Sequence, residues 1–231
     1  MVETVANMIE DKIKDLKRWE KKHTKKEEAM NILTHGLGIG LSIAGLTIMV
    51  ALASIRHNPW AIVSCAIFGF TMILLYFAST FCHFTTGSKG EKFFEIFDNI
   101  AIYFLIAGTY TPYSLCTMKH SSAGWTMFGI IWFLAIFGTI VKFRYKDKQP
   151  RWTVLLYLGM GWTFVVFSWW FIPMLTSKGL TFLLAGGLCY TVGILFYLWR
   201  WLPFSHAIWH LFVLAGSIMH FFSILYGCVL I

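Results

Sequence analysis

Seven apolar segments dominate the chain, and each is long enough to cross the hydrocarbon core of a membrane, which takes about 20 residues of α-helix. Charged residues gather in the short connections between them, so that 58% of the 231 residues are hydrophobic and only 13% are charged. This distribution is typical of a chain whose solvent is lipid. The segments cover roughly residues 31–55, 59–83, 94–117, 121–142, 152–175, 179–200 and 206–230.

The apolar segments are continuous rather than alternating, which excludes a transmembrane β-barrel and leaves helices. Short connections make consecutive helices antiparallel. The sequence therefore predicts an all-α fold, a polytopic seven-transmembrane-helix bundle formed by residues 31–231 and preceded by a charged N-terminal segment, residues 1–30. That segment has apolar residues three to four positions apart among many lysines. This pattern indicates either an amphipathic helix on an anionic membrane surface or a solvated cytoplasmic helix.

The orientation of the bundle follows from the positions of lysine and arginine, which favour the cytoplasmic side of short loops. The N-terminal segment and the second, fourth and sixth connections hold 16 of the 19 basic residues, and the other three connections hold three. This predicts a cytoplasmic N-terminus and an outer C-terminus, in a plasma (inner) membrane of bacterial type. Membrane lipids, including a lipid substrate, are the expected partners, and no nucleic-acid partner is expected.

A few ionisable residues lie within the apolar segments, where they are energetically costly and mark a functional site by default. In the predicted orientation, His83 lies at the inner end of the second span and Asp98 lies near the inner end of the third. His206 and His210 lie in the first turns of the seventh span, which also starts inside. Four residues that are distant in sequence are thus predicted to meet at one depth on the cytoplasmic side.

The spacing of these residues indicates a metal site. His206 and His210 are four apart and project from one helix face, and Ser79 is four residues before His83. Three imidazoles suit Zn²⁺ and leave its fourth position for water, which Asp98 could hold or deprotonate. Ser79 could hydrogen-bond Asp98, the water or a substrate carbonyl. Each residue alone also has a structural interpretation, as an interfacial histidine or as a carboxylate paired with a loop lysine, but their coincidence favours the metal site.

Other polar residues are expected to play supporting roles. His35, with Asn31 and Glu27, lies near the inner end of the first span and is expected to support the ligands rather than bind metal. His220 follows His206 by 14 residues, which places it roughly 21 Å deeper, too far to join the same metal. It is expected to bond a neighbouring helix, with a proton path as the alternative. The five cysteines form no CxxC pair, which indicates buried apolar residues rather than a disulfide framework.

Four separated motifs give the chain a family resemblance. The motifs are NILTHGLGIG (31–40), YFASTFCHF (76–84), FDNIAIYFLIAGTYTPY (97–113) and FSHAIWHLFVLAGSIMH (204–220). Together they resemble the haemolysin III family, the bacterial-type branch of the progestin and adiponectin receptor (PAQR) group, in order and in spacing.

The resemblance implies a seven-helix bundle with a cytoplasmic N-terminus and a zinc ion near the cytoplasmic face. It assigns the zinc ligands to His83, His206 and His210, and the family's aspartate and serine to Asp98 and Ser79. The wider superfamily includes alkaline ceramidases, which hydrolyse lipid amides.

Three functions are compatible with this pattern. The first is a zinc-dependent hydrolase of lipid amide or ester bonds, with Asp98 and Ser79 as catalytic residues. The second is a receptor-like or membrane-homeostasis sensor in which zinc is structural. The third is a membrane-permeabilising haemolysin, as the family name suggests; the chain lacks a segment that would switch from a soluble to an inserted state, so this function ranks last.

Overall fold

Long helices account for most of the fold. The computed structural model describes residues 24–145, 152–199 and 201–231, and the regular structure within these ranges is helical throughout. Six of the helices described are long and apolar enough to span a membrane. They are α2 (Lys25–Ile55), α3 (Pro59–Phe84), α4 (Glu91–Pro112), α5 (Ser122–Arg144), α9 (Ser177–Leu198) and α10 (Ser205–Ile224). When the π-helical turns that extend α4 to Thr117 and α10 to Val229 are counted, these six match six of the predicted spans to within a few residues, except that α2 begins six residues before the first span. The chain is therefore a membrane protein.

The ends of the helices follow local sequence signals. The side chain of Thr24 accepts a hydrogen bond from the backbone of Glu27, whose own side chain bonds the Thr24 backbone, and this capping box starts α2. Asn58 caps α3, which has Pro59 in its first turn, where a missing N–H costs nothing. Helices α4 and α10 each end in one π-helical turn, Tyr113–Thr117 and Leu225–Val229, and these two turns contact each other.

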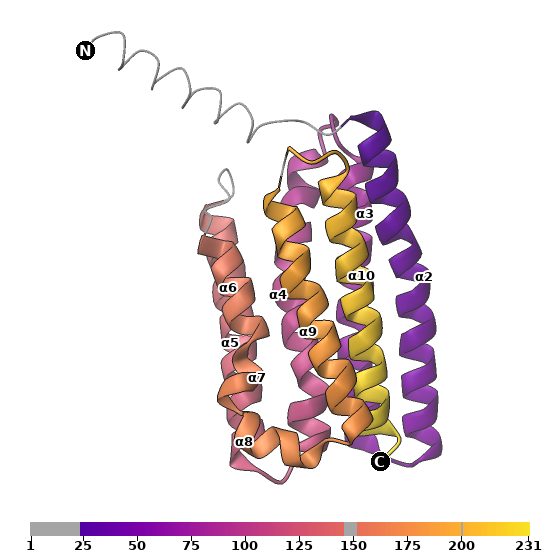
Figure 1. Ribbon diagram of the computed structural model, residues 1–231, viewed down its shortest axis with the longest axis vertical. Helices are drawn as coiled ribbons and strands as arrows, with labels where there is room; N and C mark the ends of the chain where they lie inside the picture. The colour runs from indigo at the N-terminus through magenta and orange to yellow at the C-terminus, as the bar shows by residue number, and fades with distance from the viewer. Residues whose placement is uncertain (1–23, 146–151, 200) are drawn as a thin grey trace, which may run out of the picture.

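The helices form an antiparallel bundle, with α2 at one edge and the fifth apolar segment at the other (Figure 1). Helix α3 packs on α2 and α4, and α10 packs on α9 and α2. The approach of α2 to its neighbours is close at Gly38, where a Cβ atom would lie 2.4 Å from the ring of Tyr76. The Tyr76 hydroxyl then donates to Ser217 of α10 at 2.7 Å, which ties three helices together.

The fifth apolar segment differs from its prediction as one continuous helix. It consists of α6 (Trp152–Gly161), α7 (Thr163–Val166), α8 (Ser168–Phe171) and a 3-10 turn (Ile172–Met174). Glycine within a helix costs about 1 kcal/mol, and α6 carries Gly159 and Gly161 at its end. The number of membrane crossings and their direction remain predictions, as does the N-terminal amphipathic helix, most of which lies outside the described residues.

A tyrosine from another helix supplies hydrogen-bond partners at the first break in this segment, between α6 and α7. The Tyr110 hydroxyl of α4 donates to the Gly161 carbonyl at 2.6 Å and accepts from the Phe164 backbone N–H at 3.0 Å. An unpaired backbone group in an apolar surrounding costs several kcal/mol, so broken helices persist in membranes only where other groups satisfy them. The two hydrogen bonds of Tyr110 thereby stabilise the break between α6 and α7.

Replacing Tyr110 by phenylalanine is expected to destabilise the protein by about 1–3 kcal/mol, because the ring stays while both backbone groups lose their partner. Thermal unfolding of the purified protein in detergent measures the loss. Tyr145→Phe is the matched control, since Tyr145 is 51% exposed at the end of α5. Equal melting temperatures for the two variants would contradict this role of Tyr110.

Candidate metal centre

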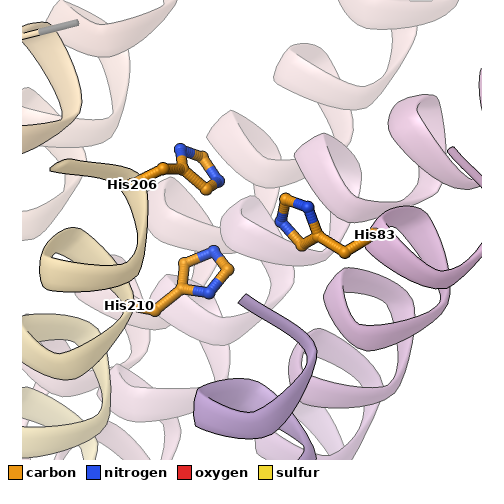
Figure 2. Close-up of side chains that lie close together, drawn as sticks. All are labelled: His83, His206 and His210. Carbon is orange, nitrogen blue, oxygen red and sulfur yellow. The ribbon is translucent and has the colours of Figure 1, made fainter. Parts of the chain in front are cut away.

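Three imidazoles meet at the end of the bundle where α2 and α10 begin and α3 ends. His206 and His210 project from the first turns of α10, and His83 faces them from the last turn of α3 (Figure 2). Each offers a ligating nitrogen, and these nitrogens lie within 4.8 Å of one another. The ring centroids are 4.6–5.1 Å apart. Among the residues that the structure describes, this group could hold a metal ion.

The geometry of the three imidazoles fits a tetrahedral metal. Zinc–nitrogen bonds of about 2.0–2.1 Å place tetrahedral ligands roughly 3.4 Å apart, so small side-chain rotations bring these nitrogens into coordination. The second ring nitrogens are already engaged: Nδ1 of His83 lies 2.7 Å from Glu28 Oε2, and Nδ1 of His210 lies 3.2 Å from Thr34 Oγ1. Both rings therefore leave Nε2 as the ligating atom.

A fourth histidine, His35, supports the centre from α2. Its ring stacks on that of His210 with centroids 3.5 Å apart and an interplanar angle of 13°. It also meets Tyr76 edge-on at 5.1 Å. His35 is buried and lines the same cavity as His83, His206 and His210. These contacts restrict the rotation of His210, which agrees with the supporting position expected for His35.

Asp98, in the second turn of α4, faces His83 and Ser79 of α3. Its carboxylate accepts a hydrogen bond from the Ser79 hydroxyl, one turn before His83 on α3, and it interacts electrostatically with His83. Lys142 of α5 is buried, and its positive charge interacts electrostatically with both Asp98 and Glu95. The site therefore combines nitrogen ligands for a cation with a carboxylate that is held by a hydroxyl and balanced by positive charge.

A cavity of about 870 Å³ extends from these residues into the bundle. One end is polar and includes Glu28, Ser79, His83, Asp98, His206 and His210. The interior is lined mainly by apolar and aromatic side chains, among them Leu105, Ile106, Tyr113, Phe164, Phe171 and Leu183. Tyr113, at the start of the π-helical turn that follows α4, lies 15 residues after Asp98, which is roughly 22 Å of helix. A polar end thus continues into a long, mostly apolar space.

The structure places the remaining polar residues named from the sequence in separate roles. Asn31 Nδ2 lies 3.4 Å from His83 Nδ1. Glu27 accepts backbone N–H groups from Thr24 at 2.7 Å and from Phe204 at 3.1 Å, so it joins the start of α2 to the start of α10. His220 stacks on Tyr190 of α9 at 5.5 Å and lines the deep part of the cavity, away from the three ligands.

Two residues in contact with the ligands, Glu28 and Thr34, are absent from the sequence-based site. Glu28 lies three residues before Asn31, which lies four residues before His35, so the three residues share one face of α2. That spacing could have identified it. The contact of Thr34 with His210 depends on how α2 and α10 pack, which spacing along one helix does not reveal.

Comparison with known proteins gives consistent matches over most of the chain. A family model described as haemolysin-III related matches residues 23–221, which include the whole centre. Hemolysin-3 of Bacillus cereus is 47% identical over 201 residues, covering 87% of this chain and 91% of the relative. The Hemolysin-3 homolog of Bacillus subtilis (strain 168) is 42% identical over 206 residues, covering 89% and 96%. The human monocyte to macrophage differentiation factor is 33% identical over 206 residues, covering 86% and 83%.

Proposed function

Because the chain belongs to the haemolysin-III related family of membrane proteins, and because the carboxylate of Asp98 interacts with one of its three clustered histidines, we propose that it is a zinc-dependent hydrolase of lipid amide or ester bonds. One observation carries this proposal: the three histidines, Asp98 and Ser79 line the polar end of a cavity whose interior is mostly apolar. A sensor with structural zinc has no need for a carboxylate and a long apolar space at its metal.

The residues have distinct parts in the proposed reaction. When bound, zinc supplies a Lewis acid for the carbonyl oxygen and lowers the pKa of water to near 7. Asp98 orients the attacking water and takes its proton, and the Ser79 hydroxyl fixes the carboxylate in place. Attack of the water oxygen makes the carbonyl carbon tetrahedral. The proton held by Asp98 then passes to the departing nitrogen or oxygen as its bond to that carbon breaks, which releases the fatty acid and the amine or alcohol.

The cavity matches the hydrocarbon part of such a substrate. An extended chain advances about 1.2 Å per bond, so roughly 22 Å accommodates about 18 bonds. Apolar and aromatic walls retain this chain by the hydrophobic effect, while the carbonyl group is held at the polar end. The protein would then position the scissile bond mainly through contacts with the chain beyond it.

The direct test is turnover by purified protein loaded with zinc. The substrates are a long-chain ceramide and a matched acyl ester, and the free fatty acid is measured by mass spectrometry. The proposal predicts fatty acid release that stops when a chelator removes the metal and returns when zinc is restored. Absence of release from every amide and ester in the set would contradict it.

Gly187 offers a test of the chain-binding role of the cavity. It lines the cavity on α9, with no neighbouring atom within 4 Å of an added Cβ. It lies ten residues from Tyr197, whose ring is 6.2 Å from that of His206, so it is roughly 15 Å into the cavity. Gly187→Phe is therefore expected to reduce turnover of acyl chains longer than about 12 bonds at least tenfold, and to spare shorter ones.

Turnover measured across a series of acyl chain lengths checks this expectation. Gly129→Phe is the matched control, because Gly129 is exposed on α5 and also has no atom within 4 Å of an added Cβ. If Gly187→Phe and Gly129→Phe show the same dependence on chain length, hydrocarbon does not occupy the cavity.

A membrane-permeabilising activity is the second function to test, because the name of the Bacillus cereus relative, 47% identical, refers to haemolysis. Liposomes loaded with a self-quenched dye report it directly. Leakage that rises with added protein and does not change in an Asp98→Asn variant would favour permeabilisation over hydrolysis.

A further inference from the structure

Helix α2 supplies no ligand to the proposed metal centre, yet its first three turns contact or constrain all three histidines. Glu28 meets His83 at 2.7 Å, and Thr34 meets His210 at 3.2 Å. Glu27 accepts the N–H of Phe204, directly before α10, and thereby fixes the backbone that carries His206. The contact restrains a residue with a φ of 57°, a conformation that side chains other than glycine rarely adopt.

The contact between Glu28 and His83 is the strongest of these. At 2.7 Å it has the length of a charge-assisted hydrogen bond. Both side chains are largely shielded from water, with relative exposures of 15% for Glu28 and 8% for His83. An ionised carboxylate only accepts hydrogen bonds, so Nδ1 of His83 carries the proton, and in the neutral imidazole Nε2 then presents its lone pair.

The contact between Thr34 and His210 has the same consequence. The single hydroxyl proton of Thr34 is directed at the carbonyls of Met30 and Asn31 in its own helix, at 2.9 and 3.0 Å. Its oxygen can then only accept from His210 Nδ1, so this ring also presents Nε2. Thr34 is a neutral partner, however, whereas Glu28 brings a negative charge to the imidazole it holds, which favours a cation on the opposite ring nitrogen.

We infer that Glu28 is a positioning residue of the metal centre, which fixes the orientation and tautomer of His83 and strengthens its bond to a divalent metal. This inference rests on the proposed metal site and extends it to a residue that touches neither metal nor substrate. Carboxylates in this position typically change metal affinity by 10- to 100-fold. The first turns of α2 would then set how tightly the metal is held.

The experiment measures zinc affinity of the purified full-length protein by competition with a chelator of known affinity. Glu28→Gln keeps an acceptor oxygen and removes the charge, and we expect about tenfold weaker binding. Glu28→Ala removes both, and we expect about 100-fold weaker binding. Glu91→Gln is the control, because Glu91 lines the same cavity but its Oε2 accepts from the backbone of Gly87.

Two further measurements separate positioning from a general loss of stability. The zinc-free melting temperature of Glu28→Gln should equal that of wild type. The visible absorption of bound cobalt(II) should shift in the Glu28 variants, because the hydrogen bond that orients one ligand has changed. It should stay unchanged in Glu91→Gln.

Wild-type zinc affinity in both Glu28 variants would overturn the role of Glu28 and leave the metal centre intact. A fall in zinc affinity that only parallels a fall in zinc-free stability would also overturn it. Failure of the wild type to bind zinc at all would overturn the metal centre as well.

Discussion

Replacing both His206 and His210 by alanine is expected to reduce bound zinc from about one ion per chain to none. Two of the three proposed ligands are then missing, and a single imidazole does not retain the metal against a chelator. Elemental analysis of the purified protein after dialysis measures the metal directly. Zinc should raise the melting temperature of the wild type and leave that of the variant unchanged, since only the form that binds the ligand is stabilised by it.

The matched control for this double variant is His220→Phe. It removes a buried imidazole from the same helix, and the new ring can still stack on Tyr190. Zinc content should remain that of wild type. If the double alanine variant kept stoichiometric zinc while circular dichroism showed it folded, the assignment of the metal to these histidines would be wrong.

Asp98→Asn is expected to lower lipid hydrolysis by about 100- to 10,000-fold, the range over which a positioned general base accelerates a reaction. The amide keeps the size of the side chain and its ability to accept from Ser79, but it cannot take a proton from water. Zinc content should not change, because the three imidazoles remain in place. Product release at saturating substrate measures the effect.

Glu95→Gln provides the comparison for Asp98→Asn. Glu95 is a second carboxylate on α4 that lines the same cavity and faces the same lysine. Its variant should retain most of the activity. Equal rates for wild type and Asp98→Asn would show that the reaction does not need proton transfer through Asp98. Equal losses of activity in Asp98→Asn and Glu95→Gln would show that the overall charge of the cavity, and not a general base, causes the effect.

Much of the fold could be predicted from the sequence, because length and apolar character alone define a helix that crosses lipid. Six of the seven predicted spans correspond to helices of about the expected bounds. The prediction for residues 152–175 was less accurate. Hydropathy reports the free energy of transferring side chains from water to an apolar medium, and it contains no information on which groups the backbone hydrogen-bonds. It therefore could not show that this segment is divided into helices α6, α7 and α8.

The grouping of His83, His206 and His210 in the candidate metal centre could be predicted for a different reason. Histidines and an aspartate in apolar segments are rare enough that their common depth is informative, and the helical spacing of His206 and His210 places both on one face. Contacts between helices are beyond such reasoning. The meeting of Glu28 with His83 spans 55 positions in the chain, and that of Thr34 with His210 spans 176.

The hydroxyl of Tyr110 has a consequence for comparing this chain with its relatives. Because it completes the hydrogen bonding of Gly161 and Phe164 from a different helix, the shape of one cavity wall depends on a residue some 50 positions upstream. A relative with phenylalanine in place of Tyr110 would have to close residues 161–164 into a regular helical turn. Alignments restricted to the fifth segment would miss that dependence. Paired variation between position 110 and residues 161–164 would reveal which family members have the same cavity wall.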